Sequence, residues 1–502
     1  MQNNVLDYLN ETVLRIPDKT AFSDGTDSLT FREVYEQSRA IGFWLYRRGV
    51  YKKPVVVFMN KHPKEVTAFL GVITGGCFYI PVDLEMPAMR IELILQNAGS
   101  EVMICDNHTI EMAKTLKFSG EIVLYENICR IAVEDEALKH IKDRVLDTDL
   151  IYVVFTSGST GIPKGVTGCH RSAIDYVEQL SEVLQFGEDT IFGNQAPLYF
   201  DACMKEMYPT LKFGATTYLI PRDLFLFPLK LAEFLNQYQI NTLCWVVSAL
   251  TMISAFGTFD NIVPKYLRKI AFVGEVFPIK QFNKWRKALP EVEYVNLYGP
   301  TEGTGVCCYY RVNREFAVEE VMPIGRPFKN TEILLLNDRV ELAANGEEGE
   351  ICIRGTCLAH GYYKDMEKTR EVFVQNPLNQ DYPELIYRTG DVGRYNENGE
   401  LMFVSRKDSQ IKHMGHRIEL GEIEVCVAAI EGVDAAGCVY EQQRKKIALY
   451  YVGGISEKEL AAAIKNSVPR YMVPNIIYKL EKMPYTPNGK LDRKALKGLN
   501  DT

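Results

Sequence analysis

The sequence has no long apolar run, no block of basic residues and no paired cysteine motif. Without roughly 20 consecutive apolar residues, it predicts no membrane-spanning helix. The polar, acid-containing stretch 1–24 is unlike a signal peptide. The formal net charge is −8 with both signs interleaved, which gives little support to a protein that coats nucleic acid. We therefore expect a cytoplasmic protein that binds neither a membrane nor nucleic acid.

The twelve cysteines are scattered, and only Cys307 and Cys308 are adjacent. Such usage in a long chain is typical of reduced thiols rather than of a disulfide framework. Apolar residues make up 47% of the chain and charged residues 24%, as in an ordinary globular protein. A chain of 502 residues exceeds what one hydrophobic core usually organises, so we expect two or more domains.

Apolar β-rich runs alternate with amphipathic helical stretches, which predicts a layered α/β architecture with buried sheets. Helical spacing marks residues 63–70 and 229–238. From residue 332 onward, short strands separated by Gly and Asn turns predict a β-rich subdomain. The predicted strands before it are residues 55–58, 102–105, 151–156, 216–220, 242–247 and 269–273.

The pattern changes again after Asp408. We predict a helix at 418–429, two strands between 435 and 452, and a helix at 457–467. This final stretch, of about 95 residues, is long enough for a small α+β domain. We therefore place a core domain at 1–407 and a C-terminal domain at 408–502.

A loop rich in glycine and hydroxyl side chains follows the predicted strand 151–156. Glycines let backbone N–H groups approach an anion, hydroxyls add donors, and Lys164 adds a positive charge. The loop is not a Walker A motif, because Pro163 stands where that motif needs glycine. A flexible surface loop is the alternative, and the preceding strand and final lysine argue against it. The predicted phosphate-binding residues are Thr156, Ser157, Gly158, Ser159, Thr160, Gly161 and Lys164.

Residues 156–166 resemble the phosphate loop of the adenylate-forming superfamily, which includes acyl-CoA synthetases, firefly luciferase and the adenylation domains of nonribosomal peptide synthetases. Residues 296–302, 387–391, 405–412 and 487–494 resemble further motifs of that superfamily, in its order. The resemblance covers about residues 29–496 and is strongest to freestanding amino-acid adenylation domains. It implies an α/β fold with a large N-terminal domain and a small, mobile C-terminal domain.

The motif at 296–302 resembles the family's adenine-binding segment. Tyr298 offers a flat face to a purine, and Asn296 offers an amide to its exocyclic nitrogen. Thr301 can donate to the α-phosphate, and Glu302 supplies a hard oxygen ligand for Mg²⁺. Taken alone, the same residues would suggest an ordinary turn.

Four further residues take roles from the resemblance. Asp391 matches the aspartate that binds the ribose hydroxyls. Arg406 matches the arginine that approaches the nucleotide, although Ser405 replaces the usual preceding glycine. Asp408 matches the interdomain hinge. Lys490, beyond an Asn-Gly turn, matches the catalytic lysine, whereas a lysine near a chain end is otherwise a solvated charge.

The resemblance implies an adenylating ligase that uses ATP and Mg²⁺. Lys490 would bridge the substrate carboxylate and the α-phosphate, so positioning and electrostatics carry the rate without a protein nucleophile. Pyrophosphate leaves and an acyl-AMP remains. In a second half-reaction the C-terminal domain rotates about Asp408, and a thiol takes the acyl group beside Gly415.

Asp201 matches the aspartate that begins the family's amino-acid pocket and pairs with the substrate ammonium. A buried carboxylate needs a cationic partner, although Asp201 could instead cap a helix. Lys205 among apolar walls predicts a glutamate-like or aspartate-like substrate. If Lys205 instead extends to solvent, the pocket suits a small substrate such as alanine. By motif offset, the predicted pocket comprises Asp201, Ala202, Lys205, Val273, Leu297, Gly305 and Val306.

No carrier-protein motif follows Lys490 and no condensation-like segment precedes the core, so we expect any carrier protein, with its phosphopantetheine thiol, to be a separate partner. We also expect a monomer. The enzyme would be freestanding or excised from a larger synthetase for nonribosomal peptide synthesis. An acyl-CoA synthetase for a small carboxylic acid is the alternative, and Asp201 argues against it. A regulator without catalysis is disfavoured by the joint presence of Lys164, Glu302, Asp391, Arg406 and Lys490.

Overall fold

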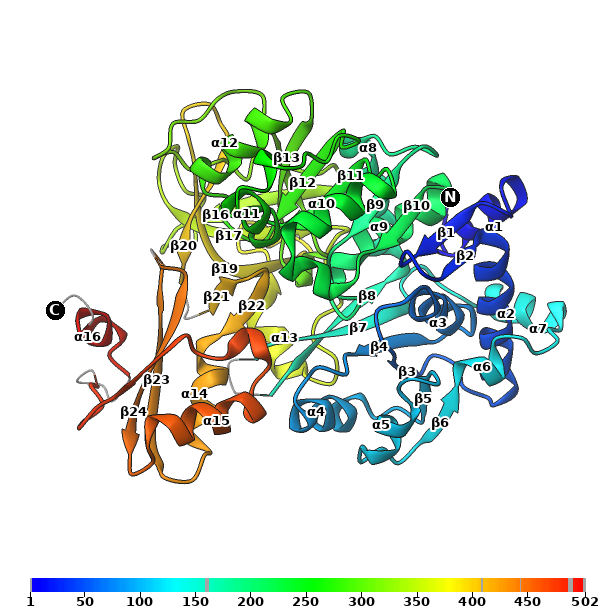
Figure 1. The fold of residues 1–502 in the computed structure, drawn as a ribbon, viewed down its shortest axis with the longest axis horizontal. Coiled ribbons are helices and arrows are strands. Elements are labelled where there is room, and N and C mark those ends of the chain that lie inside the picture. The colour runs from blue at the N-terminus through cyan, green and yellow to red at the C-terminus, as the bar shows by residue number, and fades with distance from the viewer. Residues whose placement is uncertain (1, 159–161, 408–409, 443, 486–490, 500–502) are drawn as a thin grey trace.

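The computed structural model describes residues 2–158, 162–407, 410–442, 444–485 and 491–499 (Figure 1). Ser159, Thr160, Gly161, the hinge Asp408 and the catalytic Lys490 lie outside these residues, so their roles stay predictions. Among the described residues, no helix combines the length and apolar character needed to cross a bilayer.

One mostly parallel sheet of the N-terminal part has the strand order β6-β5-β3-β4-β7-β8 in the described chain. Its antiparallel pair joins β7 to β8. All residues of β3 and β4 are buried, as expected for continuous apolar strands in a sheet covered on both faces. The strands are β3 (Pro54–Phe58), β4 (Phe78–Val82), β5 (Val102–Cys105), β6 (Glu121–Leu124), β7 (Leu150–Thr156) and β8 (Lys164–Cys169).

A second large sheet has the order β15-β14-β13-β12-β11-β9-β10-β1-β2. Strands β9 to β13 run parallel, so their carboxyl ends lie at one edge. The strands are β1 (Thr20–Ser23), β2 (Ser28–Thr30), β9 (Ile191–Asn194), β10 (Thr216–Leu219), β11 (Thr242–Val246), β12 (Lys269–Val273), β13 (Glu293–Tyr298), β14 (Cys308–Arg311) and β15 (Arg326–Pro327).

Helices cover both sheets and form the layers that the alternating pattern predicted. Helices α8 (His170–Leu184) and α9 (Met204–Phe213) contribute to the core between the sheets, as do α1 (Asp7–Arg15), α2 (Phe31–Arg47) and α3 (Pro63–Thr74). Thr30 and Glu33 form a capping box that starts α2. The outer faces carry α4 (Ala88–Ala98) and α5 (Ile110–Thr115) on one sheet and α10 (Pro228–Gln237), α11 (Val247–Ala255) and α12 (Ile279–Ala288) on the other. The short helices α6 (Tyr125–Ile128) and α7 (Asp135–Lys142) complete this part.

A smaller antiparallel sheet follows, with the order β16-β17-β19-β18 and with β20 paired to β19. It matches the β-rich subdomain predicted from residue 332 onward. Its elements are β16 (Thr331–Leu336), β17 (Gly349–Gly355), α13 (Met366–Val372), β18 (Phe373–Gln375), β19 (Leu385–Tyr395) and β20 (Leu401–Arg406).

The C-terminal part is a small α+β unit, and the predicted fold class is confirmed. Its outer sheet has the order β23-β24-β25. The boundary at residue 408 stays a prediction. The elements are β21 (Gln410–His413), β22 (His416–Glu419), α14 (Leu420–Ala428), β23 (Val433–Glu441), β24 (Lys446–Gly453), α15 (Glu457–Ser467), β25 (Ile476–Lys479) and α16 (Arg493–Gly498).

The predicted helix at 418–429 begins two residues late, at Leu420, because His416–Glu419 pairs with Gln410–His413 as a hairpin. Met414 and Gly415 turn between the strands with positive φ angles of 52° and 79°. A short apolar segment fits a strand or a helix equally well, so the sequence pattern missed this hairpin. Figure 1 shows β21 and β22 against the N-terminal part, whereas β23 and β24 extend to one side.

Candidate functional site

A cavity of about 120 Å³ lies where the N-terminal part meets the β21–β22 hairpin. Thr156 ends β7, Val246 ends β11 and Val273 ends β12, so the cavity opens at the carboxyl ends of parallel strands. This is where open α/β sheets bind ligands. The predicted site residues that line it are Thr156, Ser157, Asp201, Ala202, Lys205, Val273, Thr301, Gly305, Val306, Asp391 and Arg406.

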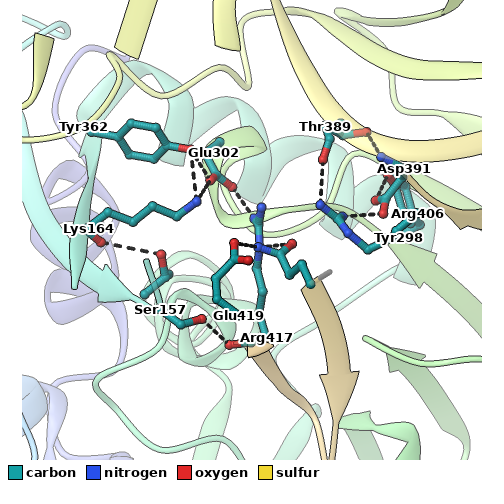
Figure 2. A network of polar contacts seen from close by, with 12 residues as sticks. Ser157, Lys164, Tyr298, Glu302, Tyr362, Thr389, Asp391, Arg406, Arg417 and Glu419 are labelled. Carbon is teal, nitrogen blue, oxygen red and sulfur yellow. Dashed lines mark hydrogen bonds and ion pairs between the residues drawn. The ribbon is translucent and has the colours of Figure 1, made fainter. Parts of the chain in front are cut away.

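Glu302 lies beside this cavity, completely buried and surrounded by cations. Arg417 Nη1 is 2.6 Å from one carboxylate oxygen, and Lys164 Nζ is 3.6 Å from the other (Figure 2). Tyr362 Oη donates a hydrogen bond of 2.7 Å to Oε1. Burial alone would raise the pKa of Glu302, but the charges of Arg417 and Lys164 lower it far below its usual value. The carboxylate is therefore ionised.

Lys164 begins β8, and its side chain is only 10% exposed. Its ammonium lies 4.9 Å from the centre of the Tyr362 ring and 3.3 Å from the hydroxyl. Burial lowers the pKa of Lys164, while Glu302 acts in the opposite direction. The predicted phosphate-binding cation and the predicted metal ligand thus share one cluster.

A second polar cluster surrounds Asp391. Tyr298 Oη donates to Asp391 Oδ2 at 2.6 Å, and Arg406 Nη1 donates to Oδ1 at 2.5 Å. Asp391 and Arg406 face each other across the β19–β20 pair, so the strand register brings them together. Asn296 is buried nearby, where its Nδ2 donates to the Pro323 carbonyl at 2.7 Å. The predicted adenine-binding and ribose-binding groups are therefore neighbours in space.

Leu297 does not line the cavity, against the prediction. It is 2% exposed and packs with Val295 in the core between the two sheets. Neighbouring side chains of a strand face opposite sides, so Leu297 points into this core, whereas Asn296 and Tyr298 face the other way, toward Pro323 and Asp391.

Asp201 and Lys205 also line the cavity. They are 9% and 2% exposed, respectively. Burial raises the pKa of Asp201, and the charge of Lys205 opposes this shift. The 3-10 helix η1 (Asp201–Cys203) is capped by Phe200, and α9 is capped by Cys203. Neither helix has a side-chain hydrogen bond at its cap. The alternative in which Asp201 caps a helix is therefore not observed.

Lys205 lines the cavity and is buried from the protein surface. It makes no hydrogen bond or ion pair with another residue in the described part of the chain. The alternative in which Lys205 extends to solvent is therefore not observed. A buried cation that forms no ion pair of its own can accept an anionic group from a ligand.

The hairpin and the helix after it contribute residues for which sequence reasoning assigned no role. Lys412 Nζ lies 5.3 Å from the centre of the Tyr298 ring. Ser157 Oγ donates to the Arg417 carbonyl at 2.6 Å. Arg417 lies five residues beyond the matched segment 405–412, and its positive charge was the one signal that the sequence offered. Tyr362 lies in no motif.

Comparison with known proteins gives a match to the family described as "AMP-binding enzyme" over residues 9–363. Tyrocidine synthase 1 of Brevibacillus parabrevis is 32% identical across 96% of this chain, which covers 43% of that protein. Gramicidin S synthase 1 of Brevibacillus brevis is 30% identical across 97% of this chain, which likewise covers 43% of that protein. The chain thus spans less than half the length of either relative.

Solved structures support the same fold. The Vibrio cholerae adenylation domain AlmE, in complex with glycyl-adenosine-5'-phosphate, has a TM-score of 0.86 at 21% identity and covers 100% of this chain and 98% of its own. The o-succinylbenzoate CoA synthetase of Bacillus subtilis has a TM-score of 0.84 at 19% identity, covering 99% and 98%. At these identities the likeness establishes the arrangement of the chain alone.

Proposed function

This chain belongs to the AMP-binding enzyme family, and we propose that it is an amino-acid adenylating ligase. It would form an aminoacyl-AMP and pyrophosphate from an amino acid and ATP. It would then pass the acyl group to the phosphopantetheine thiol of a separate carrier protein. The observation that carries this proposal is one cavity lined by both Asp201 and Thr301, with the Lys164–Glu302 pair beside it.

The residues around Glu302 fit a magnesium–nucleotide complex. An ionised, buried carboxylate is a hard oxygen ligand of the kind Mg²⁺ takes together with substrate phosphates. Bound Mg²⁺ would supply positive charge to the phosphates. Lys164 and the loop N–H groups would hold the phosphates, Thr301 would donate to the α-phosphate, and Asp391 would accept from the ribose.

Adenylation requires two anions, the substrate carboxylate and the α-phosphate, to approach each other. We assign Lys490 to bridge them, from the mobile domain 408–502 that turns about Asp408. Holding both reactants beside fixed cations reduces their repulsion and makes the reaction effectively unimolecular. No nucleophile from this chain is needed.

The substrate is proposed to be an α-amino acid with an acidic side chain. Asp201 would pair with its ammonium group, because burial disfavours the charged form of Asp201 until a cation approaches. Lys205, four residues later on the same helical face, would pair with a side-chain carboxylate. Ala202, Val273, Gly305 and Val306 would form the apolar walls.

The test is ATP–pyrophosphate exchange with D- and L-amino acids, aryl acids and fatty acids. We expect glutamate or aspartate to support the fastest exchange. Exchange with fatty or aryl acids but with no amino acid would contradict the proposal.

The alternative is an acyl-CoA synthetase for a small carboxylic acid. The two functions differ in the thiol that accepts the acyl group. Free coenzyme A and a carrier protein bearing phosphopantetheine should be compared as acceptors. Faster transfer to free coenzyme A would favour the alternative.

A further inference from the structure

A second cavity lies between helices α1, α2, α3 and α7, and none of the described residues of the proposed active site lines it. Its volume of about 350 Å³ is nearly three times the 120 Å³ of the first cavity. Helices α1, α2 and α7 lie together at the right of Figure 1, away from the C-terminal part. Protein interiors hold few voids larger than a water molecule, whereas ligand pockets begin at about 300 Å³. The second cavity therefore has the size of a ligand pocket.

Much of the lining of this cavity is apolar. The apolar side chains come from the N-terminal segment with α1, from α3 and from α7 with the loop that follows it, and each is less than 10% exposed. A hydrocarbon group that enters such a cavity leaves water and contacts these side chains, which is favourable. The apolar lining residues are Leu6, Leu9, Ile73, Leu138, Ile141 and Val145.

The charged residues that line the same cavity are mostly cations. Arg39, Lys139 and Lys142 contribute three positive charges, and Asp135 contributes one negative charge. Lys142 already pairs with Asp7 at 2.8 Å. The balance of charge at this cavity therefore favours an anionic group on a ligand.

Arg39 is the cation best placed to bind such a group. Its side chain is 24% exposed, whereas Asp135, with which it forms an ion pair, is 88% exposed. Ion pairs with so exposed a partner contribute little to stability, so a ligand anion can replace Asp135 at low cost. The Arg39 guanidinium lies 5.1 Å from the centre of the Tyr35 ring, which favours one position of the side chain. A planar guanidinium suits the two oxygens of a carboxylate.

An amide group adds a hydrogen-bond donor to the lining. Asn4 is 5% exposed, and its Oδ1 accepts from the Leu6 N–H at 2.9 Å. Its Nδ2 makes no hydrogen bond with another residue that the structure describes. A buried donor without a partner is costly, so it favours a ligand that brings an acceptor oxygen.

We propose that this second cavity binds an apolar carboxylate, an organic acid with a body of several methylene groups. The hydrocarbon body would contact the apolar lining, and the carboxylate would replace Asp135 on Arg39. This inference goes beyond the proposed function and does not rest on it. The alternative is a cavity filled by water, which would show no preference for a hydrocarbon chain.

The first test is calorimetric titration of the full chain, without ATP or an amino acid, using butanoate, hexanoate, octanoate and octanamide as probes. Each methylene added between butanoate and octanoate should tighten binding by about fourfold, the effect of burying one methylene group. Octanamide has the same chain as octanoate but no charge, so it should bind about tenfold more weakly.

The second test uses two variants of the lining. Arg39→Gln should weaken octanoate binding by about tenfold and leave octanamide binding unchanged, because only the charged probe loses a partner. Asn10→Trp places a large side chain at the cavity and should abolish binding of both probes. The controls are Arg32→Gln, which removes a cation of the same helix that pairs with Asp18, and Leu14→Trp, at an 84% exposed position of α1. Both controls should bind octanoate as the wild type does.

Octanoate is itself a carboxylic acid, so binding to the first cavity has to be distinguished. Lys205→Ala, which alters only the first cavity, should leave octanoate binding unchanged. Octanoate should slow hydrogen exchange in the peptides 35–42 and 135–145 but not in 201–213. The inference is overturned if octanoate does not bind, if octanamide binds as tightly, if Asn10→Trp binds like the wild type, or if Lys205→Ala abolishes binding. None of these results bears on adenylation, which pyrophosphate exchange tests separately.

Discussion

Tyr362 donates a hydrogen bond of 2.7 Å to Glu302, and the same hydroxyl lies 3.3 Å from the Lys164 ammonium. One buried phenol therefore connects the proposed metal ligand to the proposed phosphate-binding cation. Because the carboxylate is ionised, this is a charge-assisted bond, which is stronger than a neutral one. It holds Glu302 in one orientation, as a ligand to a metal requires.

Replacing Tyr362 with Phe should therefore lower the free energy of unfolding and also weaken magnesium-dependent ATP binding. Loss of a hydrogen bond to a charged group costs about 2 kcal/mol in the free energy of unfolding. We also expect ATP binding to require about tenfold more Mg²⁺, as for loss of other groups that orient metal ligands. Denaturant unfolding and a magnesium titration of ATP binding measure the two effects. Tyr363→Phe is the matched control, because its hydroxyl contacts the Ala98 carbonyl away from Glu302.

Lys205 should determine which amino acid is activated. Replacing Lys205 with Ala removes the cation proposed to pair with the side-chain carboxylate of the substrate. The kcat/KM for the acidic amino acid should therefore fall by about a hundredfold or more, as when one member of a buried charge pair is lost. Pyrophosphate exchange measures this preference. Lys212→Ala, in the last turn of the same helix, removes a cation that pairs with Glu178 and should have no such effect. If Lys205→Ala leaves kcat/KM for the preferred substrate unchanged, that substrate has no acidic side chain that pairs with Lys205.

Lys490→Ala should abolish adenylate formation while ATP still binds. A group that acts on charge developing in the transition state contributes about a hundredfold or more to the rate. Exchange kinetics and ATP titration should be compared in the same preparation. Lys497→Ala, at an exposed position of α16, is the control. Full turnover by the Lys490 variant would show that another cation bridges the reactants.

Glu206 should make stability depend on pH. Burial raises the pKa of this carboxyl from 4.5 to about 7, against the opposing charge of Lys205. Between these pH values the unfolded chain releases the proton first, so the free energy of unfolding falls as pH rises, by roughly 3 kcal/mol in total. Above pH 7 Glu206 is ionised in both the folded and the unfolded chain, so it causes no further change in the free energy of unfolding.

Glu206→Gln should match the wild type near pH 4 and exceed it in stability above pH 7, because the amide never ionises. Thermal unfolding from pH 4 to pH 9 measures the difference between the two curves. Glu233→Gln, at an exposed position on α10, should show no comparable divergence. Parallel curves for Glu206→Gln and the wild type would show that Glu206 is not stabilised in its protonated form.

The sequence by itself determined the layered α/β class and several element bounds. Strands β5 and β12 and helix α15 have the predicted limits, because short apolar runs and a capped 3.6-residue period are local signals. The order of short motifs also predicted eleven of the residues that line the cavity. Tertiary structure alone decided the contacts of Arg417 and Tyr362 and the inward placement of Leu297. These contacts depend on how distant segments pack and on which face of a strand points to the cavity. Local periodicity in the sequence specifies neither.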